Sequence, residues 1–126
     1  MHSGTCLCGA IQFTVEGNLP APNACHCTQC RKMSGHYWAS VDIARDRLRI
    51  ADDSAVRWYQ SSAKVRRGFC ANCGSFLFWD PLSGGATAVA MGAFDGPTRT
   101  RLARHIFTAD RGDYYDITDD LPQNRQ

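Results

Sequence analysis

The sequence lacks any apolar run close to the roughly 18–20 residues that a helix needs to cross a bilayer. Its first ten residues, MHSGTCLCGA, lack the basic and then apolar pattern of a secretion signal. Neither sign of charge dominates, because 14 Lys and Arg stand against 12 Asp and Glu. A hydrophobic content of 44% argues against a disordered chain. We expect a single cytoplasmic domain spanning residues 1–126, with its core over about residues 4–122 and a C-terminal tail that frays.

Cysteine is prominent, yet too scarce for a disulfide scaffold. Seven cysteines in 126 residues fall below the roughly 8–10% typical of such scaffolds, and the number is odd. In a reducing compartment, clustered thiols indicate metal ligands rather than bridges. They form three groups: TCLCG with Cys6 and Cys8, CHCTQC with Cys25, Cys27 and Cys30, and CANCGS with Cys70 and Cys73. Two groups contain C-x-x-C, a spacing that lets two thiolates converge on one tetrahedral zinc ion.

Seven thiolates divide into a closed four-cysteine site and a three-cysteine site with one open position, the patterns of structural and catalytic zinc. One partition joins Cys6, Cys8, Cys70 and Cys73 and leaves Cys25, Cys27 and Cys30 as a local trio. The other joins Cys27, Cys30, Cys70 and Cys73. We favour the first, because three ligands so close in sequence need little loop closure. A single structural zinc with three spare buried thiols is a further alternative.

The remaining pattern is one of short strands. Strands are predicted over residues 11–15, 37–43, 48–50, 56–59, 65–69, 76–79, 86–94, 105–108 and 114–117. No stretch shows helical periodicity over a dozen residues. The sequence therefore predicts a mainly β fold with at most one or two short helices.

A zinc ion held by three thiolates is a weaker Lewis acid than one held by three histidines, so hydroxide-generating hydrolysis is disfavoured. Such a site favours a soft fourth ligand, and a thiol bound there would lose its proton and stay nucleophilic. We therefore expect an enzyme that activates a small thiol at Cys25, Cys27 and Cys30 for reaction with a carbonyl carbon.

Other polar residues are candidates for supporting roles. His26 lies between two ligands and could transfer protons, although adjacent residues of an extended segment point in opposite directions. Arg31 and Lys32 could hold the carboxylates of a small acidic thiol, or form a solvated basic turn. Three more residues could act near the carbonyl oxygen or simply pack or lie at the surface: His36, His105 and Asp95.

The alternative function is a non-catalytic zinc module that binds protein or nucleic acid, with both ions structural. Its support is a basic and aromatic set: Trp58, Tyr59, Lys64, Arg66 and Arg67. Seven thiolates and two divalent ions would remove seven charges and add four, taking the formal charge from +2 to −1. That balance argues against a general nucleic-acid binder. A fourth side chain closing the second metal site would favour this alternative.

Three strings together resemble one family: GTCLCGAI, CHCTQCRKMSG and FCANCGSFLFW. They are similar to the glutathione-dependent formaldehyde-activating enzyme (CENP-V/GFA) family, as are the later MGAFDGP, HIF and DITDDLP. The resemblance spans about residues 4–122. One departure is Tyr114, which stands where the family pattern often has Trp.

The resemblance implies a β-rich fold similar to Mss4 with two zinc ions. By position, Cys6, Cys8, Cys70 and Cys73 match the family's structural ligands, and Cys25, Cys27 and Cys30 match its catalytic ligands. The implied activity is that of a carbon–sulfur lyase, which joins glutathione to formaldehyde to give S-hydroxymethylglutathione. The implied partners are therefore a small thiol and an aldehyde.

Overall fold

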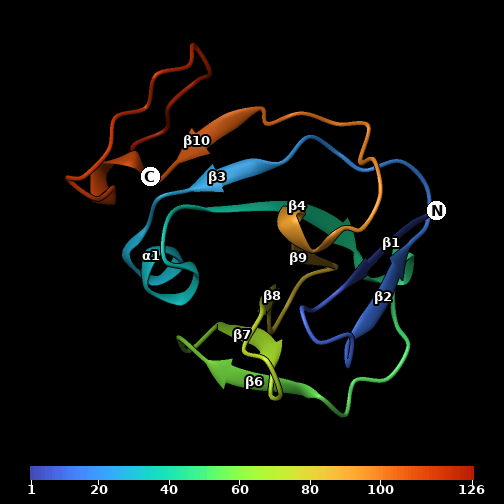
Figure 1. Cartoon of the computed structure of the whole chain (residues 1–126). Helices are drawn as coiled ribbons and strands as arrows, with labels where there is room; N and C mark the ends of the chain where they lie inside the picture. Colours follow the sequence, from blue (N-terminus) through green and yellow to red (C-terminus); the bar gives the residue numbers. More distant parts are fainter.

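Two β-sheets and one short helix make up the computed structural model, which describes residues 1–126 (Figure 1). The larger sheet has the order β10 (Arg104–Ile106), β3 (Asn23–Cys25), β4 (Trp38–Ala44), β9 (Ala86–Ala90), β8 (Phe76–Pro81), β7 (Val65–Cys70) and β6 (Val56–Gln60). The smaller sheet has the order β1 (His2–Thr5), β2 (Gln12–Val15) and β5 (Leu48–Ile50). All pairs are antiparallel except β10 with β3. The predicted mainly β fold is confirmed.

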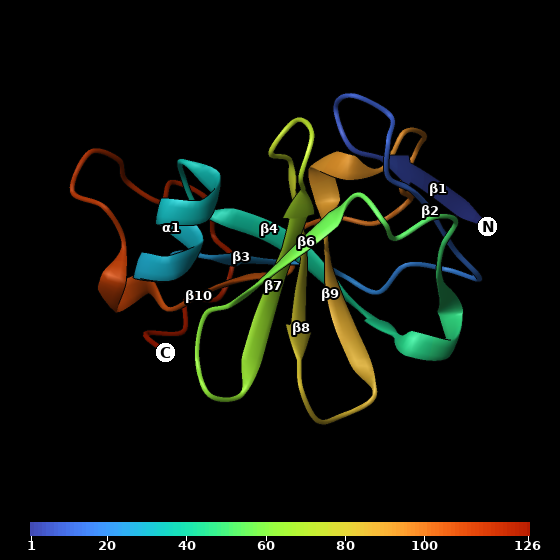
Figure 2. The ribbon, with the colours of Figure 1, turned by 90° about the horizontal axis from the view of Figure 1, so that it is seen from below.

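Figure 2 shows β6, β7, β8 and β9 side by side, with α1 (Thr28–Ser34) at one end of the molecule and β1 and β2 at the other. Three short 3-10 turns complete the structure: η1 (Arg45–Arg47), η2 (Met91–Ala93) and η3 (Thr108–Asp110). No helix combines the length and the apolar character needed to cross a membrane.

The main core lies where the small sheet packs against the large one. Phe13 and Val15 alternate with polar residues along β2, and their side chains are buried. The Phe13 ring meets those of Phe78 and Phe94 edge-on, with centroids 5.8 Å and 5.5 Å apart. Burial of each such side chain contributes roughly 1.5–3 kcal/mol, which explains why the alternating segment forms a strand here.

A second, smaller apolar cluster contains two of the cysteines. Cys25 and Cys30 pack there with Trp38, whose indole stacks on Phe76 at a centroid distance of 4.4 Å. This cluster lies at the α1 end of the large sheet and fixes the backbone that carries the CHCTQC motif.

Helix α1 begins inside that motif. Cys27 is its N-cap, and the Cys27 sulfur accepts a hydrogen bond from the Cys30 amide. Gly35 ends the helix with φ of 89°, a left-handed conformation that glycine adopts without strain. With seven residues, α1 is too short to produce a periodic apolar pattern.

Three strand predictions in the C-terminal half of the chain differ from the structure. The strand predicted over residues 105–108 corresponds to β10 but ends at Ile106, before η3. The strand predicted over residues 86–94 ends at Ala90, where η2 follows. Residues 114–117 form no strand; the hydroxyl groups of Tyr114 and Tyr115 instead hydrogen-bond to His36 and His26.

Backbone hydrogen bonds join the C-terminal segment to the chain around β10. His105 donates its amide to the Pro122 carbonyl at 2.9 Å and accepts from the Asn124 amide at 2.8 Å. Thr108 likewise donates to Asn124 at 3.1 Å. The segment therefore runs along β10, as the position of the C-terminus in Figure 1 shows.

Candidate metal centres

The first cysteine cluster joins the turn after β1 to the end of β7 and the turn that follows it. The sulfur atoms of Cys6, Cys8, Cys70 and Cys73 all lie within 4.8 Å of one another. Cys8 and Cys70, which are 62 residues apart in sequence, have their sulfurs 3.7 Å apart. The structure thus brings together the four cysteines of the favoured partition.

Backbone amides surround this cluster. The Ile11 amide donates to Cys6 Sγ at 3.2 Å, and the Asn72 amide donates to Cys70 Sγ at 3.4 Å. A hydrogen bond from the Ser75 hydroxyl helps lower the pKa of Cys73 to about 5. These donors favour thiolates, and four convergent thiolates fit a tetrahedral soft cation.

The second cluster is local. Cys25 ends β3, Cys27 caps α1, and Cys30 lies in the first turn of α1, with all three sulfurs within 4.8 Å of one another. Hydrogen bonds from the thiols of Cys25 and Cys30 lower the pKa of Cys27, whereas contacts with Cys27 and Cys30 raise the pKa of Cys25. The three sulfurs are therefore close enough to influence one another's ionisation. This cluster also could hold a metal ion.

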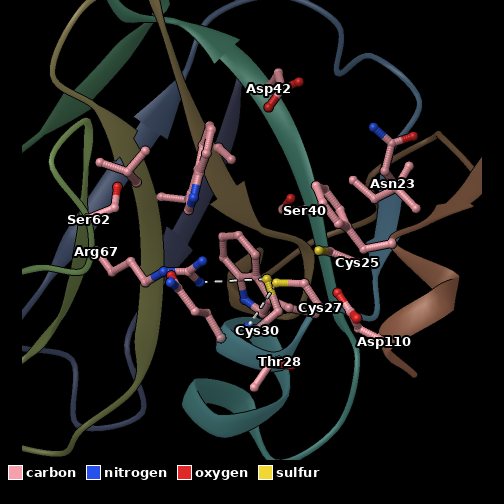
Figure 3. A pocket seen from close by; sticks show the side chains of 17 residues that line it. Asn23, Cys25, Cys27, Thr28, Cys30, Ser40, Asp42, Ser62, Arg67 and Asp110 are labelled. Carbon is pink, nitrogen blue, oxygen red and sulfur yellow. Dashed lines mark hydrogen bonds between the residues drawn. The ribbon is translucent and has the colours of Figure 1, made fainter. Parts of the chain in front are cut away.

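No fourth cysteine, histidine or carboxylate has its donor atom within 4.8 Å of all three sulfurs of this cluster. Instead, the three cysteines line a cavity of about 560 Å³ (Figure 3). That volume is within the range of small-molecule sites. Three donors would leave one position of a tetrahedral ion to an outside ligand, and the cavity provides the space for it.

The cavity has an apolar and a polar lining. Trp38 and Trp79 supply aromatic walls. The polar lining residues are Asn23, Thr28, Gln29, Ser40, Asp42, Ser62, Arg67 and Asp110. A site of this kind can exclude bulk water from one part of a small ligand while its polar groups orient another part.

Arg67 lines the cavity, although the sequence analysis did not propose it as a residue of this site. Its side chain is buried, and Nη1 donates to Cys30 Sγ at 3.6 Å. Its neighbour Arg66 points elsewhere, with its guanidinium 3.8 Å from the centre of the Trp58 ring and bonded to Asp80. Strand alternation separates the two arginines and was the available signal, because it places Arg67 on the same face as Val65, a residue that also lines the cavity.

His26 is fully buried and does not line the cavity, in keeping with the alternation between Cys25 and Cys27. Its Nδ1 lies 2.5 Å from the Tyr115 hydroxyl oxygen, and its Nε2 lies 2.9 Å from His105 Nδ1. Burial, followed by the nearby His105, lowers the pKa of His26 to about 4. His26 is therefore neutral at neutral pH and has no contact with a ligand in the cavity.

The other sequence candidates also lie outside the cavity lining. Arg31 and Lys32 are in the last turn of α1. His36 contacts the Tyr114 hydroxyl at 2.6 Å, and Asp95 accepts a hydrogen bond from Thr5 at 3.0 Å. His105 is buried and donates toward the Asp119 carboxylate at 2.9 Å, which lowers the pKa of Asp119.

Known proteins resemble this chain in sequence and in fold. An uncharacterized lyase of Schizosaccharomyces pombe is 26% identical over 117 residues, covering 92% of this chain and 85% of that protein. A putative glutathione-dependent formaldehyde-activating enzyme of Halomonas elongata is 31% identical over 87 residues, covering 62% of this chain and 55% of that protein. The chain thus matches only about half the length of the second relative.

A crystal structure of a Rhodobacter sphaeroides protein superposes with a TM-score of 0.65 at 21% identity, covering 80% of this chain and 99% of the other, which shows a shared fold. The family model described as "glutathione-dependent formaldehyde-activating enzyme" matches residues 1–110, a range that contains all seven cysteines. The chain belongs to the glutathione-dependent formaldehyde-activating enzyme family.

Proposed function

We propose that this protein is a zinc-dependent carbon–sulfur lyase that adds a small thiol, such as glutathione, to an aldehyde and also catalyses the reverse cleavage. One observation supports this most directly: three cysteine sulfurs converge without a fourth donor from the chain and face a cavity of about 560 Å³. The names of the relatives, a lyase and a putative glutathione-dependent formaldehyde-activating enzyme, agree with this chemistry.

We assign different tasks to the two cysteine clusters. Cys6, Cys8, Cys70 and Cys73 would hold a structural zinc ion that ties the turn after β1 to the β7–β8 turn. Cys25, Cys27 and Cys30 would hold the second ion. Zinc bound there would supply a soft Lewis acid with one free position, where a thiol is favoured as its thiolate.

The proposed reaction balances without an oxidant or reductant. The thiol loses its proton, and its sulfur forms a bond to the carbonyl carbon. The electron pair of the C=O π bond passes to the oxygen, which takes up a proton and becomes a hydroxyl group. Cleavage reverses each change.

The chain contributes binding and orientation to this reaction. Trp38 and Trp79 form apolar walls that limit water around the reacting atoms. Ser40 and Ser62 place hydroxyl groups in the cavity lining, where they can donate hydrogen bonds to substrate oxygen atoms.

A non-catalytic binding module would need its second metal site closed by the chain. The structure offers no such fourth donor, and His26, which lies between two of the cysteines, is bonded to Tyr115 and His105. The two arginines of the basic and aromatic set also do not share one surface. Arg67 lies in the cavity, and Arg66 lies on the opposite face of β7. These observations favour the enzyme.

Cobalt substitution tests the proposal. We expect glutathione added to the Co²⁺ protein to change the thiolate-to-metal charge-transfer band with saturation at one equivalent per chain. The Cys27→Ser variant should lose this response while the four-cysteine cluster keeps its band. In parallel, NMR exchange measurements with ¹³C-formaldehyde should show faster interconversion of thiol and hydroxymethyl adduct with the zinc protein. An unchanged band together with an unaccelerated exchange would refute the proposed function.

A further inference from the structure

Arg67 is a buried cation without a carboxylate partner. Its exposed fraction is 4%, and it takes part in no salt bridge. Arg45 and Arg66, by contrast, are more exposed and both pair with Asp80. A buried charge is costly unless a group of opposite charge compensates it, so the surroundings of Arg67 must provide that charge.

The cysteine cluster is the group of opposite charge beside it. Arg67 Nη1 donates to Cys30 Sγ at 3.6 Å, and Nε donates to Ser61 Oγ at 3.3 Å. The Phe76 ring, with its centre 5.7 Å from the guanidinium carbon, provides a weaker attraction. Three thiolates around one divalent ion carry a net negative charge, which Arg67 is placed to neutralise.

The guanidinium retains donors that the chain does not use. Nη2 makes no hydrogen bond to any protein group, although Nη1 and Nε do. Arg67 lines the same cavity as the three cysteines, and Figure 3 shows its guanidinium reaching toward their sulfur atoms. The planar guanidinium suits an oxygen anion better than any other side chain.

The charges of the other residues that line the cavity favour binding of an anion beside Arg67. Asp42 and Asp110 also line the cavity, are exposed, and repel negative groups. Arg67 is the only basic residue in the lining. A substrate with one negatively charged oxygen would therefore be oriented with that oxygen toward Arg67 and the sulfur cluster.

We propose that Arg67 is the anion-binding residue of this cavity, with Nη1 neutralising the cysteine cluster through Cys30 and Nη2 binding an oxygen anion of the substrate. The identity of the substrate rests on the function proposed above. In that reaction the oxygen belongs either to a carboxylate of the thiol or to the aldehyde, whose oxygen gains the C=O electron pair as the carbon–sulfur bond forms.

The experiment compares Arg67→Met with Arg57→Met, a control on the exposed face of the neighbouring strand β6. Without substrate, we expect Arg67→Met to shift the charge-transfer band of the Co²⁺ protein and to weaken metal binding at the three-cysteine cluster by about 10–100-fold. Arg57→Met should change neither. An Arg67→Met protein with an unshifted band and unchanged metal affinity would overturn the proposal, whether or not the wild-type protein is active.

Steady-state kinetics with two thiols show which oxygen atom of the substrates Arg67 binds. A rise of KM for 3-mercaptopropionate but not for uncharged 2-mercaptoethanol would support a thiol carboxylate. A fall of kcat by about 10²–10³-fold for both thiols would support the aldehyde oxygen. Equal kinetics of Arg67→Met and wild type with both thiols would overturn oxygen binding by Nη2.

Arg67→Lys keeps the positive charge and guards against a folding defect in Arg67→Met. Arg67→Lys should bind metal at the three-cysteine cluster about tenfold more tightly than Arg67→Met, because lysine retains the positive charge although it lacks the planar donor group. A lysine variant that folds but binds metal no better than Arg67→Met would contradict charge neutralisation. If the Co²⁺ spectrum of the wild-type protein does not change when thiol is added, that result would refute the proposed function independently of Arg67.

Discussion

His26 Nε2 lies 2.9 Å from His105 Nδ1, so a residue between two cysteines of the second cluster is held by the strand β10 near the other end of the chain. Asp119 bonds to the far side of His105, and the Tyr115 hydroxyl bonds to the far side of His26. The four side chains form one continuous hydrogen-bonded row. This row fixes the backbone from which Cys25 and Cys27 project.

Replacing His105 should destabilise the protein. In His105→Ala, the buried His26 Nε2 loses its partner, and we expect the free energy of unfolding to fall by about 1–3 kcal/mol. Urea unfolding of the metal-loaded protein would measure the change. His2→Ala, a variant in β1 far from this row, is the control. Equal urea midpoints of unfolding for His105→Ala and His2→Ala would show that the hydrogen-bonded row contributes little to stability.

The two cysteine clusters should respond differently to loss of one ligand. Cys70→Ser should remove one metal equivalent and lower the melting temperature strongly, because Cys70 is fully buried and its cluster closes a long loop. Cys27→Ser should remove the other equivalent with a smaller loss. Metal content by mass spectrometry and thermal unfolding would check both. The opposite order of melting temperatures would contradict the structural role given to the first cluster.

Gly68 should not tolerate a methyl group. A Cβ atom there would lie 2.7 Å from Trp58 Cζ3, a ring carbon held against the sheet. We expect Gly68→Ala to cost about 1–3 kcal/mol by overpacking, measured by chemical unfolding. Gly85→Ala is the matched control, because nothing lies within 4 Å of its added Cβ. In Gly68→Ala/Trp58→Leu, the smaller side chain should relieve part of this cost, and strict additivity would argue against the contact.

Asp80 should stabilise the sheet through three donors. Its buried carboxylate accepts from Arg45 and Thr87 at 2.7 Å and from Arg66 at 2.8 Å. Asp80→Ala should cost about 1–3 kcal/mol, since both arginines remain partly hydrated and the buried threonine loses its acceptor. Calorimetry against the exposed control Asp46→Ala would measure this. A cost no larger than that of the control would contradict it.

Sequence reasoning located the strands whose side chains alternate. Phe13 and Val15 in β2 and the residues flanking the second C-x-x-C gave clear patterns, and the structure confirms these strands. The sequence analysis missed β1 and β3; the three residues of β3 pair with the distant β10 and show no local pattern. The prediction also extended strand β9 beyond Ala90, because the run of apolar residues continues through the η2 turn.

The candidate site was predictable only in part. Spacing grouped the cysteines, because three ligands within one short segment can converge without help from the fold. The cavity was not predictable, since its walls come from strands distant in sequence, such as those carrying Trp38 and Trp79. Arg67 was considered only as part of a basic and aromatic set, because alternation places it on the same face of β7 as Val65 but does not show that this face lines a cavity.

The parallel pairing of β3 with β10 has a consequence for biosynthesis. All seven cysteines have been synthesised once Cys73 is added, but the strand that borders Cys25 is synthesised only at Arg104–Ile106. The ribosome adds residues from the N-terminus onward at about 5–20 residues per second. The cysteines of both clusters are therefore made before the strand that completes the cavity wall beside Cys25, to which Ile106 of β10 contributes.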